Sequence, residues 1–384
     1  MDGSEMGGGA DGAADAVARD GAVMDAAGMD AAAMDAAVDA PPSGSANCIR
    51  SLSVGERHVC LLKDDGTIWC WGSNGYGPLG DGTEELRHTP TRIGMDTDWK
   101  SISAGQNRTC GLKKDGSLWC WGTNLQGEIQ KGGPSGVLRP LRIGTANDWA
   151  MVDAGKHKHV CGIRGSQIWC WGTENEYGQL GLGNMDVALS PALVMTGGLM
   201  GPSVVAPGFQ STCAITTAGA LWCWGRGSLG FVGDGTRENR LTPVLANASQ
   251  GQGGWVSVGR ERCGVRGTSG KGQLLCWGFG NPNQVDPTVP TVFGSFNDWT
   301  STDGSCGIRA DKTLWCWTYD VQNEITQIGT LSDWTHVSGQ SDNHCAVRAN
   351  RTVWCWGLGV YGMLGITNPP QRAYEPVQAG FSCQ

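Results

Sequence analysis

A unit built around paired cysteines and tryptophans recurs seven times and constrains the fold more than any other feature of the sequence. It consists of a cysteine, an apolar pair, a short polar turn and then Trp-Cys-Trp-Gly or a close variant, as in CLLKDDGTIWCWG from Cys60. Further copies begin at Cys110, Cys161, Cys213, Cys263, Cys306 and Cys345. Repeats spaced by about 40 to 50 residues are typical of rings and solenoids, because each unit buries its apolar face against its neighbours. The 384 residues can therefore form one repetitive domain.

Each unit also contains other short apolar runs. A run such as WKSISAG from Trp99 precedes the first cysteine. A Gly/Asn-rich loop follows Trp-Cys-Trp-Gly and leads into a run such as TPTRIG from Thr89. Three or four short strands per unit are the period of a propeller blade. We therefore predict an all-β fold, a seven-bladed β-propeller with four-stranded blades, over residues 48–384.

The two cysteines of each unit are expected to face each other across a β-hairpin. The loop between Cys161 and Cys170 is one residue shorter than that between Cys60 and Cys70, yet the cysteines keep their places beside the apolar residues and the tryptophan. Opposed strand residues have Cα atoms about 4.5 to 5.5 Å apart, a distance that suits a disulfide. We predict the pairs Cys60–Cys70, Cys110–Cys120, Cys161–Cys170, Cys213–Cys223, Cys263–Cys276, Cys306–Cys316 and Cys345–Cys355.

Cys48 and Cys383 remain, one at each end of the repeats. A propeller brings its two ends together, so we expect these two cysteines to pair and lock the seam of the ring. Sixteen cysteines in one chain point away from a reducing cytosol. The expected location is extracytoplasmic: secreted, periplasmic or anchored at the cell surface.

Residues 1–47 differ from the rest of the chain in composition. They are almost entirely Ala, Gly, Asp and Met, with a pentad repeated three times from Met24 to Val38. A period of five fits neither an amphipathic helix nor a strand, and the segment lacks bulky apolar side chains, so we predict a disordered acidic linker. It holds nine acidic residues and only Arg19, which accounts for the whole net charge of −8.

Residues 48–384 hold 27 acidic and 27 basic side chains, so nothing there favours nucleic acid, which requires clustered positive charge. No apolar run is long enough to span a bilayer. No signal segment opens the chain, and we expect a mature or trimmed form, which leaves open a lipid anchor upstream of the linker.

The pattern G-x-x-H-x-C-x-L-x-x-D-G-x-x-W-C-W-G-x-N-x-x-G-x-L-G, clearest from Gly55 to Gly80, resembles the regulator-of-chromosome-condensation repeat. The resemblance covers residues 48–384 and implies a seven-bladed propeller of four-stranded blades. The family includes a nuclear nucleotide-exchange factor, a plant ultraviolet-B photoreceptor and a bacterial secreted inhibitor of β-lactamases, so the fold does not fix the function. Paired cysteines in every blade depart from the nuclear members. They are similar to the exported, often lipid-anchored, repeat proteins of predatory and soil-dwelling bacteria.

No catalytic or metal-binding constellation stands out. His58 and His159 come two residues before a blade cysteine, and the expected role is a structural hydrogen bond within the blade. Close Cys-x-x-Cys pairs, which structural zinc and redox sites use, are absent. Most tryptophans belong to the repeat and serve packing first. We therefore predict no enzyme, no metal and no cofactor.

The loops before each blade cysteine break the repeat, and equivalent loops should gather at one end of the ring. These loops are basic overall, so we predict an acidic or carboxylate-bearing partner, either protein or glycan. The predicted function is an exported protein- or glycan-binding module. The alternatives are a structural surface protein without a specific ligand, a tryptophan-based light sensor or an inhibitor of an extracellular enzyme. The candidate ligand-binding residues are Arg57, His58, Arg108, Lys156, Lys158, His159, Arg262 and His344.

Overall fold

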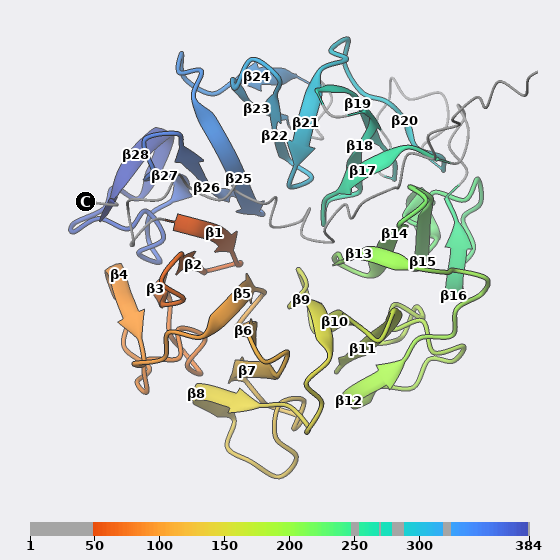
Figure 1. Cartoon of the computed structure of the whole chain (residues 1–384), viewed down its shortest axis with the longest axis horizontal. Coiled ribbons are helices and arrows are strands. Elements are labelled where there is room, and N and C mark those ends of the chain that lie inside the picture. The colour runs from red at the N-terminus through yellow and green to blue at the C-terminus, as the bar shows by residue number, and fades with distance from the viewer. Residues whose placement is uncertain (1–48, 247–252, 269, 279–287, 318–323, 383–384) are drawn as a thin grey trace, which may run out of the picture.

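The protein is a ring of antiparallel β-sheets arranged around a central axis (Figure 1). The computed structural model describes residues 49–246, 253–268, 270–278, 288–317 and 324–382. Within these ranges the chain forms 28 strands and one 3-10 turn at Ser228–Gly230, and no α-helix. The predicted linker at 1–47, together with Cys48 and Cys383, lies outside the described residues.

Each blade is a four-stranded meander made from consecutive strands. The first blade contains β1 (Ile49–Val54), β2 (His58–Lys63), β3 (Ile68–Gly72) and β4 (Arg87–Ile93). The second contains β5 (Trp99–Ala104), β6 (Arg108–Lys113), β7 (Leu118–Thr123) and β8 (Gly136–Arg142). The third contains β9 (Trp149–Asp153), β10 (His159–Arg164), β11 (Gln167–Gly172) and β12 (Ala188–Leu193). The fourth contains β13 (Pro202–Pro207), β14 (Ser211–Thr216), β15 (Leu221–Gly225) and β16 (Arg240–Leu245).

The remaining three blades repeat this order. The fifth contains β17 (Trp255–Val258), β18 (Cys263–Thr268), β19 (Lys271–Cys276) and β20 (Thr291–Val292). The sixth contains β21 (Trp299–Thr302), β22 (Cys306–Arg309), β23 (Leu314–Trp317) and β24 (Ile325–Gln327). The seventh contains β25 (Trp334–Gln340), β26 (Asn343–Arg348), β27 (Thr352–Leu358) and β28 (Arg372–Ser382). Blades five and six are joined by one bridge, Gly272 to Trp299, which merges them into a single eight-stranded sheet. The predicted seven-bladed propeller is confirmed.

The first strand of each blade lies nearest the axis and the fourth lies at the rim (Figure 1). Several of the outer strands carry a proline, which has no N–H to offer and so blocks pairing with a further strand at that position. These prolines are Pro90, Pro140, Pro191, Pro243 and Pro376.

The apolar core is divided into seven clusters, each shared by two neighbouring blades. Trp71 of the first blade, for example, packs with Val347 and Leu364 of the seventh. The second tryptophan of the repeat is buried in this way, whereas the first, such as Trp69, is partly exposed. No blade can therefore bury its faces alone, which explains why the ring must close.

The seven predicted cysteine pairs are joined in the structure, between the second and third strands of each blade. In every blade the two cysteines are directly opposed in the register, and the loop lengths differ without disturbing this. Their Cα atoms are 3.9 to 4.1 Å apart, somewhat closer than opposed residues of an ordinary pair. Seven disulfides indicate an oxidising environment.

Within the described residues, the first and last blades exchange no strand, and hydrogen bonds that involve side chains connect them across the seam of the ring. The backbone N–H of Val54 donates to Ser338 Oγ at 3.0 Å, and Trp71 Nε1 donates to the Met363 carbonyl at 2.9 Å. The predicted pairing of Cys48 with Cys383 lies outside the described residues. Among the described residues, no helix has the length and apolar character to cross a membrane.

Candidate binding face at the inner rim

The loops that join the first and second strands of the blades gather at one end of the ring, and we call them the inner-rim loops. Backbone contacts link neighbouring loops, as from Glu56 N to Gly105 O at 3.1 Å. Gln340 Nε2 donates to the Lys156 carbonyl at 2.9 Å, although these residues are 184 positions apart in the chain. The inner-rim loops span residues 55–57, 105–107, 154–158, 208–210, 259–262, 303–305 and 341–342.

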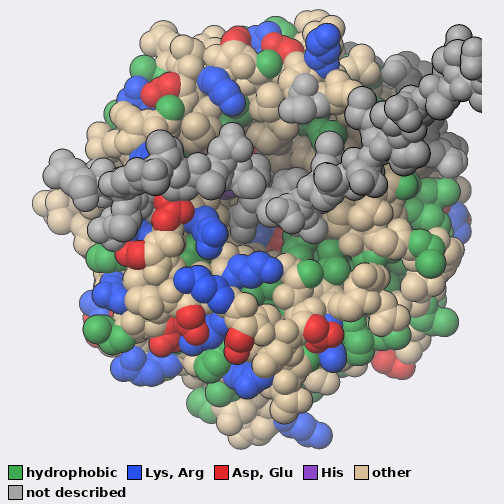
Figure 2. Space-filling model, viewed as in Figure 1, with side chains coloured by type: hydrophobic (Ala, Val, Ile, Leu, Met, Phe, Trp, Pro, Cys, Tyr) green, Lys and Arg blue, Asp and Glu red, His purple; other side chains and the backbone are tan. Residues whose placement is uncertain are grey.

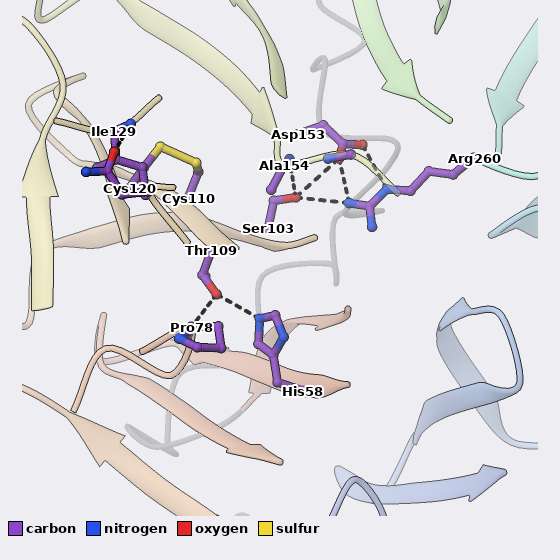
Figure 3. The surroundings of a disulfide bond; sticks show 12 residues. His58, Pro78, Ser103, Thr109, Cys110, Cys120, Ile129, Asp153, Ala154 and Arg260 are labelled. Carbon is purple, nitrogen blue, oxygen red and sulfur yellow. Dashed lines mark hydrogen bonds and ion pairs between the residues drawn. A yellow bond between two sulfur atoms is a disulfide. The ribbon is translucent and has the colours of Figure 1, made fainter. Parts of the chain in front are cut away.

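Arg260 of the fifth blade reaches across the axis to the second and third blades (Figure 3). Its Nη2 lies 2.6 Å from Asp153 Oδ1 and 3.0 Å from Ser103 Oγ, and Nη1 donates to the Ala104 carbonyl at 3.0 Å. The Asp153 side chain is only 5% exposed. A carboxylate buried this deeply needs its partner, so Arg260 ties three blades together.

Asp153 occupies a repeated position opposite the first cysteine of its blade, where the first two blades have Ser53 and Ser103. In those blades the serine Oγ accepts a hydrogen bond from the next blade, as from Ala104 N to Ser53 at 2.9 Å. The carboxylate at this position in the third blade supplies the charge that holds Arg260. The sequence signal for Arg260 is the short run WVSVG directly before it, two residues shorter than WKSISAG of the second blade.

Lys156 lies near the ion pair of Arg260 with Asp153, which we call the cross-tie, and itself forms an ion pair with Glu261. Burial, together with the nearby cations Arg262 and Arg260, lowers the pKa of Lys156 to about 8. The amine is therefore mostly charged at pH 7 and neutral well above pH 8. Its side chain is 15% exposed, so the ammonium group lies at the edge of the surface.

Two of the predicted binding residues, His58 and His159, are buried and connect neighbouring blades. His58 Nε2 contacts Thr109 Oγ1 at 2.8 Å, and His159 Nε2 contacts Thr212 Oγ1 at 2.9 Å. Because the Thr109 hydroxyl donates to the Pro78 carbonyl, His58 Nε2 must carry the proton that it donates to Thr109 (Figure 3). Burial lowers the pKa of both histidines to about 3. The prediction of a hydrogen bond within the blade was wrong, because each bond crosses to the next blade.

Two further candidates are also buried. Arg108 pairs with Glu128 at 2.9 Å, with side-chain exposures of 5% and 2%. The Arg262 guanidinium lies 3.8 Å from the centre of the Phe231 ring. Burial of these two arginines and of His58 and His159 argues against direct contact with a partner.

Arg57 and Lys158 are the candidates that are clearly exposed, with 46% and 48% of their side chains accessible. Arg57 lies over the Tyr361 ring at 4.8 Å, and Lys158 pairs with Glu174 at 2.5 Å. Both therefore stand on the surface beside an aromatic or acidic neighbour. Whether they bind a partner stays a prediction.

Exposed apolar side chains occur in the loops that follow the third strands. The loops after the third strands begin beside the inner-rim loops, since Ser73 N donates to the Arg57 carbonyl. Tyr76 and Leu229 in these loops are 44% and 41% exposed and have positive φ angles of 67° and 64°. Left-handed backbone is costly for such residues, so the fold holds these apolar side chains outward at some cost. The sequence analysis missed these residues.

His344, the last candidate, lies in a polar cluster between the sixth and seventh blades. Ser305 Oγ is 2.9 Å from His344 Nε2, and the ring stacks on Trp356. Burial lowers the pKa of His344, although Asp303 acts in the opposite direction. Asp303, Cys306 and His344 come close enough to hold a metal, but the Cys306 sulfur is taken by its disulfide. The cluster as it stands offers a metal two side chains, fewer than the four ligands of a structural zinc site.

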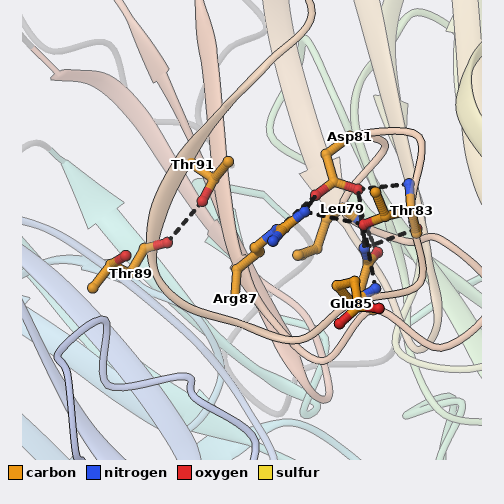
Figure 4. A network of polar contacts seen from close by, with 8 residues as sticks. Leu79, Asp81, Thr83, Glu85, Arg87, Thr89 and Thr91 are labelled. Atoms are coloured by element: carbon orange, nitrogen blue, oxygen red, sulfur yellow. Dashed lines mark hydrogen bonds and ion pairs between the residues drawn. The ribbon is translucent and has the colours of Figure 1, made fainter.

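A further network that the sequence analysis missed fixes the long loop after β3 (Figure 4). Asp81 accepts hydrogen bonds from Thr83 Oγ1 at 2.7 Å and from Arg87 Nε at 2.7 Å. We call these three residues the loop pin. The fourth blade repeats it with Asp234, Thr236 and Arg240. The shared segments GDGTEELR and GDGTRENR carry the signal.

On the face of the ring shown in Figure 2, Lys and Arg side chains alternate with Asp and Glu side chains. Among the described residues coloured there, no large patch of one sign forms.

Sequence comparison identifies the repeat. Models of the regulator of chromosome condensation (RCC1) repeat match residues 49–77, 99–128, 65–112 and 166–215. The chain is 31% identical over 145 residues to the ultraviolet-B receptor UVR8 of Arabidopsis thaliana. The matched segment covers 35% of this chain and 31% of the receptor. It is 32% identical over 116 residues to the human E3 ubiquitin-protein ligase HERC2. This match covers 28% of this chain and 2% of the ligase.

The structural comparison agrees with this. The crystal structure of human WBSCR16 superimposes with a TM-score of 0.55 at 18% identity, and the match covers 92% of this chain and 90% of that chain. That level of identity shows the fold only. Together with the matched repeats, it shows a β-propeller that contains regulator-of-chromosome-condensation repeats over residues 49–128 and 166–215.

Proposed function

We propose that the protein is an exported binding module that takes an acidic protein partner on its inner-rim face and catalyses no reaction. The observation that carries the proposal is the exposure of Arg57 and Lys158 in the inner-rim loops, where the Arg57 guanidinium lies over the Tyr361 ring at 4.8 Å. Arginine and tyrosine are over-represented among the residues that dominate protein–protein binding energy.

The rigidity of the scaffold supports the same proposal. Arg260 and Gln340 tie loops from different blades together, so the exposed side chains stand on a fixed frame. A fixed frame lowers the entropy lost on binding. Seven disulfides suit a secreted, periplasmic or surface-anchored protein, which is where we place this module.

Site-specific photo-crosslinking in the host tests the proposal. A photoreactive phenylalanine analogue at Tyr76 should give a defined protein adduct, and the same analogue at Lys100, at the opposite end of an inner strand, should not. The adduct should fall at least about tenfold when Arg57 and Lys158 are both replaced by glutamate, because charge reversal repels an acidic partner.

Lys100→Glu is the matched charge control and should leave the adduct unchanged. If the partner were a glycan, no protein adduct would form. Binding measured in a glycan-binding assay would still be lost when Arg57 and Lys158 are both replaced by glutamate. Equal adducts from both positions, or no effect of the double reversal on any ligand, would contradict the proposal.

A further inference from the structure

A groove of about 550 Å³ lies between the second and third blades, away from the inner-rim loops. Trp149, Trp169 and Pro191 form its apolar wall, and Lys131, Arg142 and Arg164 line it with positive charge. These six residues define what we call the interblade groove. Its combination of aromatic and cationic side chains is typical of a ligand site more than of a packing defect.

The groove lies beside a loop that has lost its pin. The loops after the third strands of the first and second blades have the same length, so their residues correspond one to one. Lys131, Gly133 and Val137 replace Asp81, Thr83 and Arg87 of the loop pin. All three pinning residues are changed together, and the position that carries a paired carboxylate in the first blade carries a free amine here.

The aromatic wall is also exceptional within the repeat. In four blades the indole N–H of the first tryptophan donates to a hydroxyl two residues earlier, as from Trp119 to Ser117 at 2.8 Å. The turn of the third blade is one residue shorter and has Gln167 in that place. Within the described residues, Trp169 Nε1 has no partner. Trp169, which lines the groove, thus has no hydroxyl at that place to hold its ring, and the same is true of Trp222 in the fourth blade, where Ala220 occupies the position.

The charges in the groove are not balanced. Arg164 pairs with Asp148 at 2.6 Å and lies 5.3 Å from the centre of the Trp169 ring. Among the described residues, Arg142 donates to the Thr145 carbonyl and the Asn147 amide oxygen, and its charge also acts on the Asp115 carboxylate without forming an ion pair. Lys131 is exposed, and no carboxylate pairs with it or with Arg142 among the described residues. Lys131 and Arg142 therefore face the groove without a carboxylate ion-paired to either of them, and the Glu128 carboxylate that also lines the groove is paired with Arg108.

The corresponding junction between the first and second blades shows the contrast. There Lys113, the counterpart of Arg164, pairs with both Asp96 and Asp98 at 2.9 and 3.1 Å. Arg92 corresponds to Arg142 and donates in the same way to a carbonyl, that of Met95. The counterpart of Lys131 is Asp81. The positive excess is thus present at the junction of blades two and three and absent from the junction of blades one and two.

We propose that the interblade groove binds a small organic anion with a flat apolar body, such as an aromatic carboxylate. The body lies against Trp169 and Pro191, and the carboxylate accepts hydrogen bonds from Arg142 and Lys131. This site is separate from the inner-rim face and does not depend on the protein partner proposed for it.

Isothermal titration calorimetry of the whole protein with naphthalene-2-carboxylate tests the proposal, with 2-naphthalenemethanol as the neutral probe of the same body. The carboxylate should bind at least about tenfold more tightly than the alcohol, because charge-assisted hydrogen bonds are stronger than neutral ones. Arg142→Gln should weaken carboxylate binding about tenfold and leave the alcohol unchanged. Lys131→Asp, which restores the residue of the first blade, should act in the same direction.

Arg92→Gln is the matched control, since it removes the same side chain at the junction without the groove, and it should change nothing. Equal binding of the two probes, absence of binding by both, or equal effects of Arg142→Gln and Arg92→Gln would overturn the proposal. Far-ultraviolet circular dichroism and the intact mass under non-reducing conditions report whether each variant is folded with its disulfides. The inner-rim crosslink is unaffected by Arg142→Gln, so failure of one proposal does not imply failure of the other.

Discussion

The interior of the blades and the inner rim of the ring are stabilised by different means. Inside each blade, the same disulfide and the same tryptophans recur at equivalent places, and the seven interblade clusters repeat one packing arrangement. At the inner rim, the decisive contacts occur once: Arg260 with Asp153, Lys156 with Glu261, and Gln340 with a carbonyl of the third blade. Residues shared by all repeats specify the blade, and residues that depart from the repeat give the ring its individual features.

This contrast predicts that the largest loss of stability comes from a residue that is not repeated. Arg260→Met leaves the Asp153 carboxylate buried without its partner and should lower the free energy of unfolding by about 3 to 5 kcal/mol. Guanidinium denaturation without reductant measures it. The double variant with Asp153→Ser, which installs the serine of the first two blades, should recover most of the loss. If Arg260→Met were as stable as the unsubstituted protein, the ion pair of Arg260 with Asp153 would not stabilise the ring.

The repeated features could be predicted from the sequence, because seven copies of one pattern reinforce each other. The antiparallel register of the hairpin was enough to predict each cysteine pair, since the two cysteines stay opposed whatever the length of the loop between them. Alternation along a strand could also have indicated that His58 shares the face of the buried Cys60, and so turns inward. The same alternation accounts for the burial of Arg108 and His159, which also precede a blade cysteine by two residues, but not for that of Arg262, which directly precedes Cys263.

The contacts that occur once could not be predicted in the same way. Arg260 meets Asp153 across 107 positions of sequence, and only the closed ring brings them together. Likewise, the change from Asp81 to Lys131 is visible in the sequence, but its meaning depends on the pin that Asp81 forms in the folded loop. A departure from the repeat marks a position to examine, and the structure decides what that position does.

An intermediate loss of stability is expected when one repeated staple is removed. The double variant Cys110→Ala/Cys120→Ala opens a loop of 10 residues and should cost about 2 to 3 kcal/mol by the chain-entropy estimate. The same denaturation experiment measures it, with the intact mass confirming six remaining pairs among those described. The corresponding change in the first blade, Cys60→Ala/Cys70→Ala, should cost the same amount, because the blades are equivalent in this respect. A clear difference between the two blades would mean that the staples do not act as identical units.

The last effect is a dependence of stability on pH, with no loss expected at neutral pH, and it concerns the two interblade histidines, which occupy one repeat position in only two blades. Their pKa is about 3 in the folded protein and 6.5 for the model residue. Below pH 6.5 the unfolded chain takes up protons that the folded chain does not, so stability falls as the pH falls from 6.5 towards 3. Each histidine should contribute about 1.4 kcal/mol per pH unit in that window. Above pH 6.5 it contributes no pH dependence.

His58→Gln keeps a neutral hydrogen-bonding group near Thr109 and should therefore reduce the slope of stability against pH between pH 6 and 4, whatever it does to stability at pH 7.5. His159→Gln should reduce it by a similar amount, and the double variant by the sum, because the two sites lie in different blade junctions. His88→Gln, at an exposed position, is the control and should leave the slope as it is. Carboxylates contribute to the slope in all variants equally, so the differences isolate the histidines. Unchanged slopes in the His58 and His159 variants would mean that these rings accept protons within the folded ring, and that the junctions between blades admit charge that the blade interiors exclude.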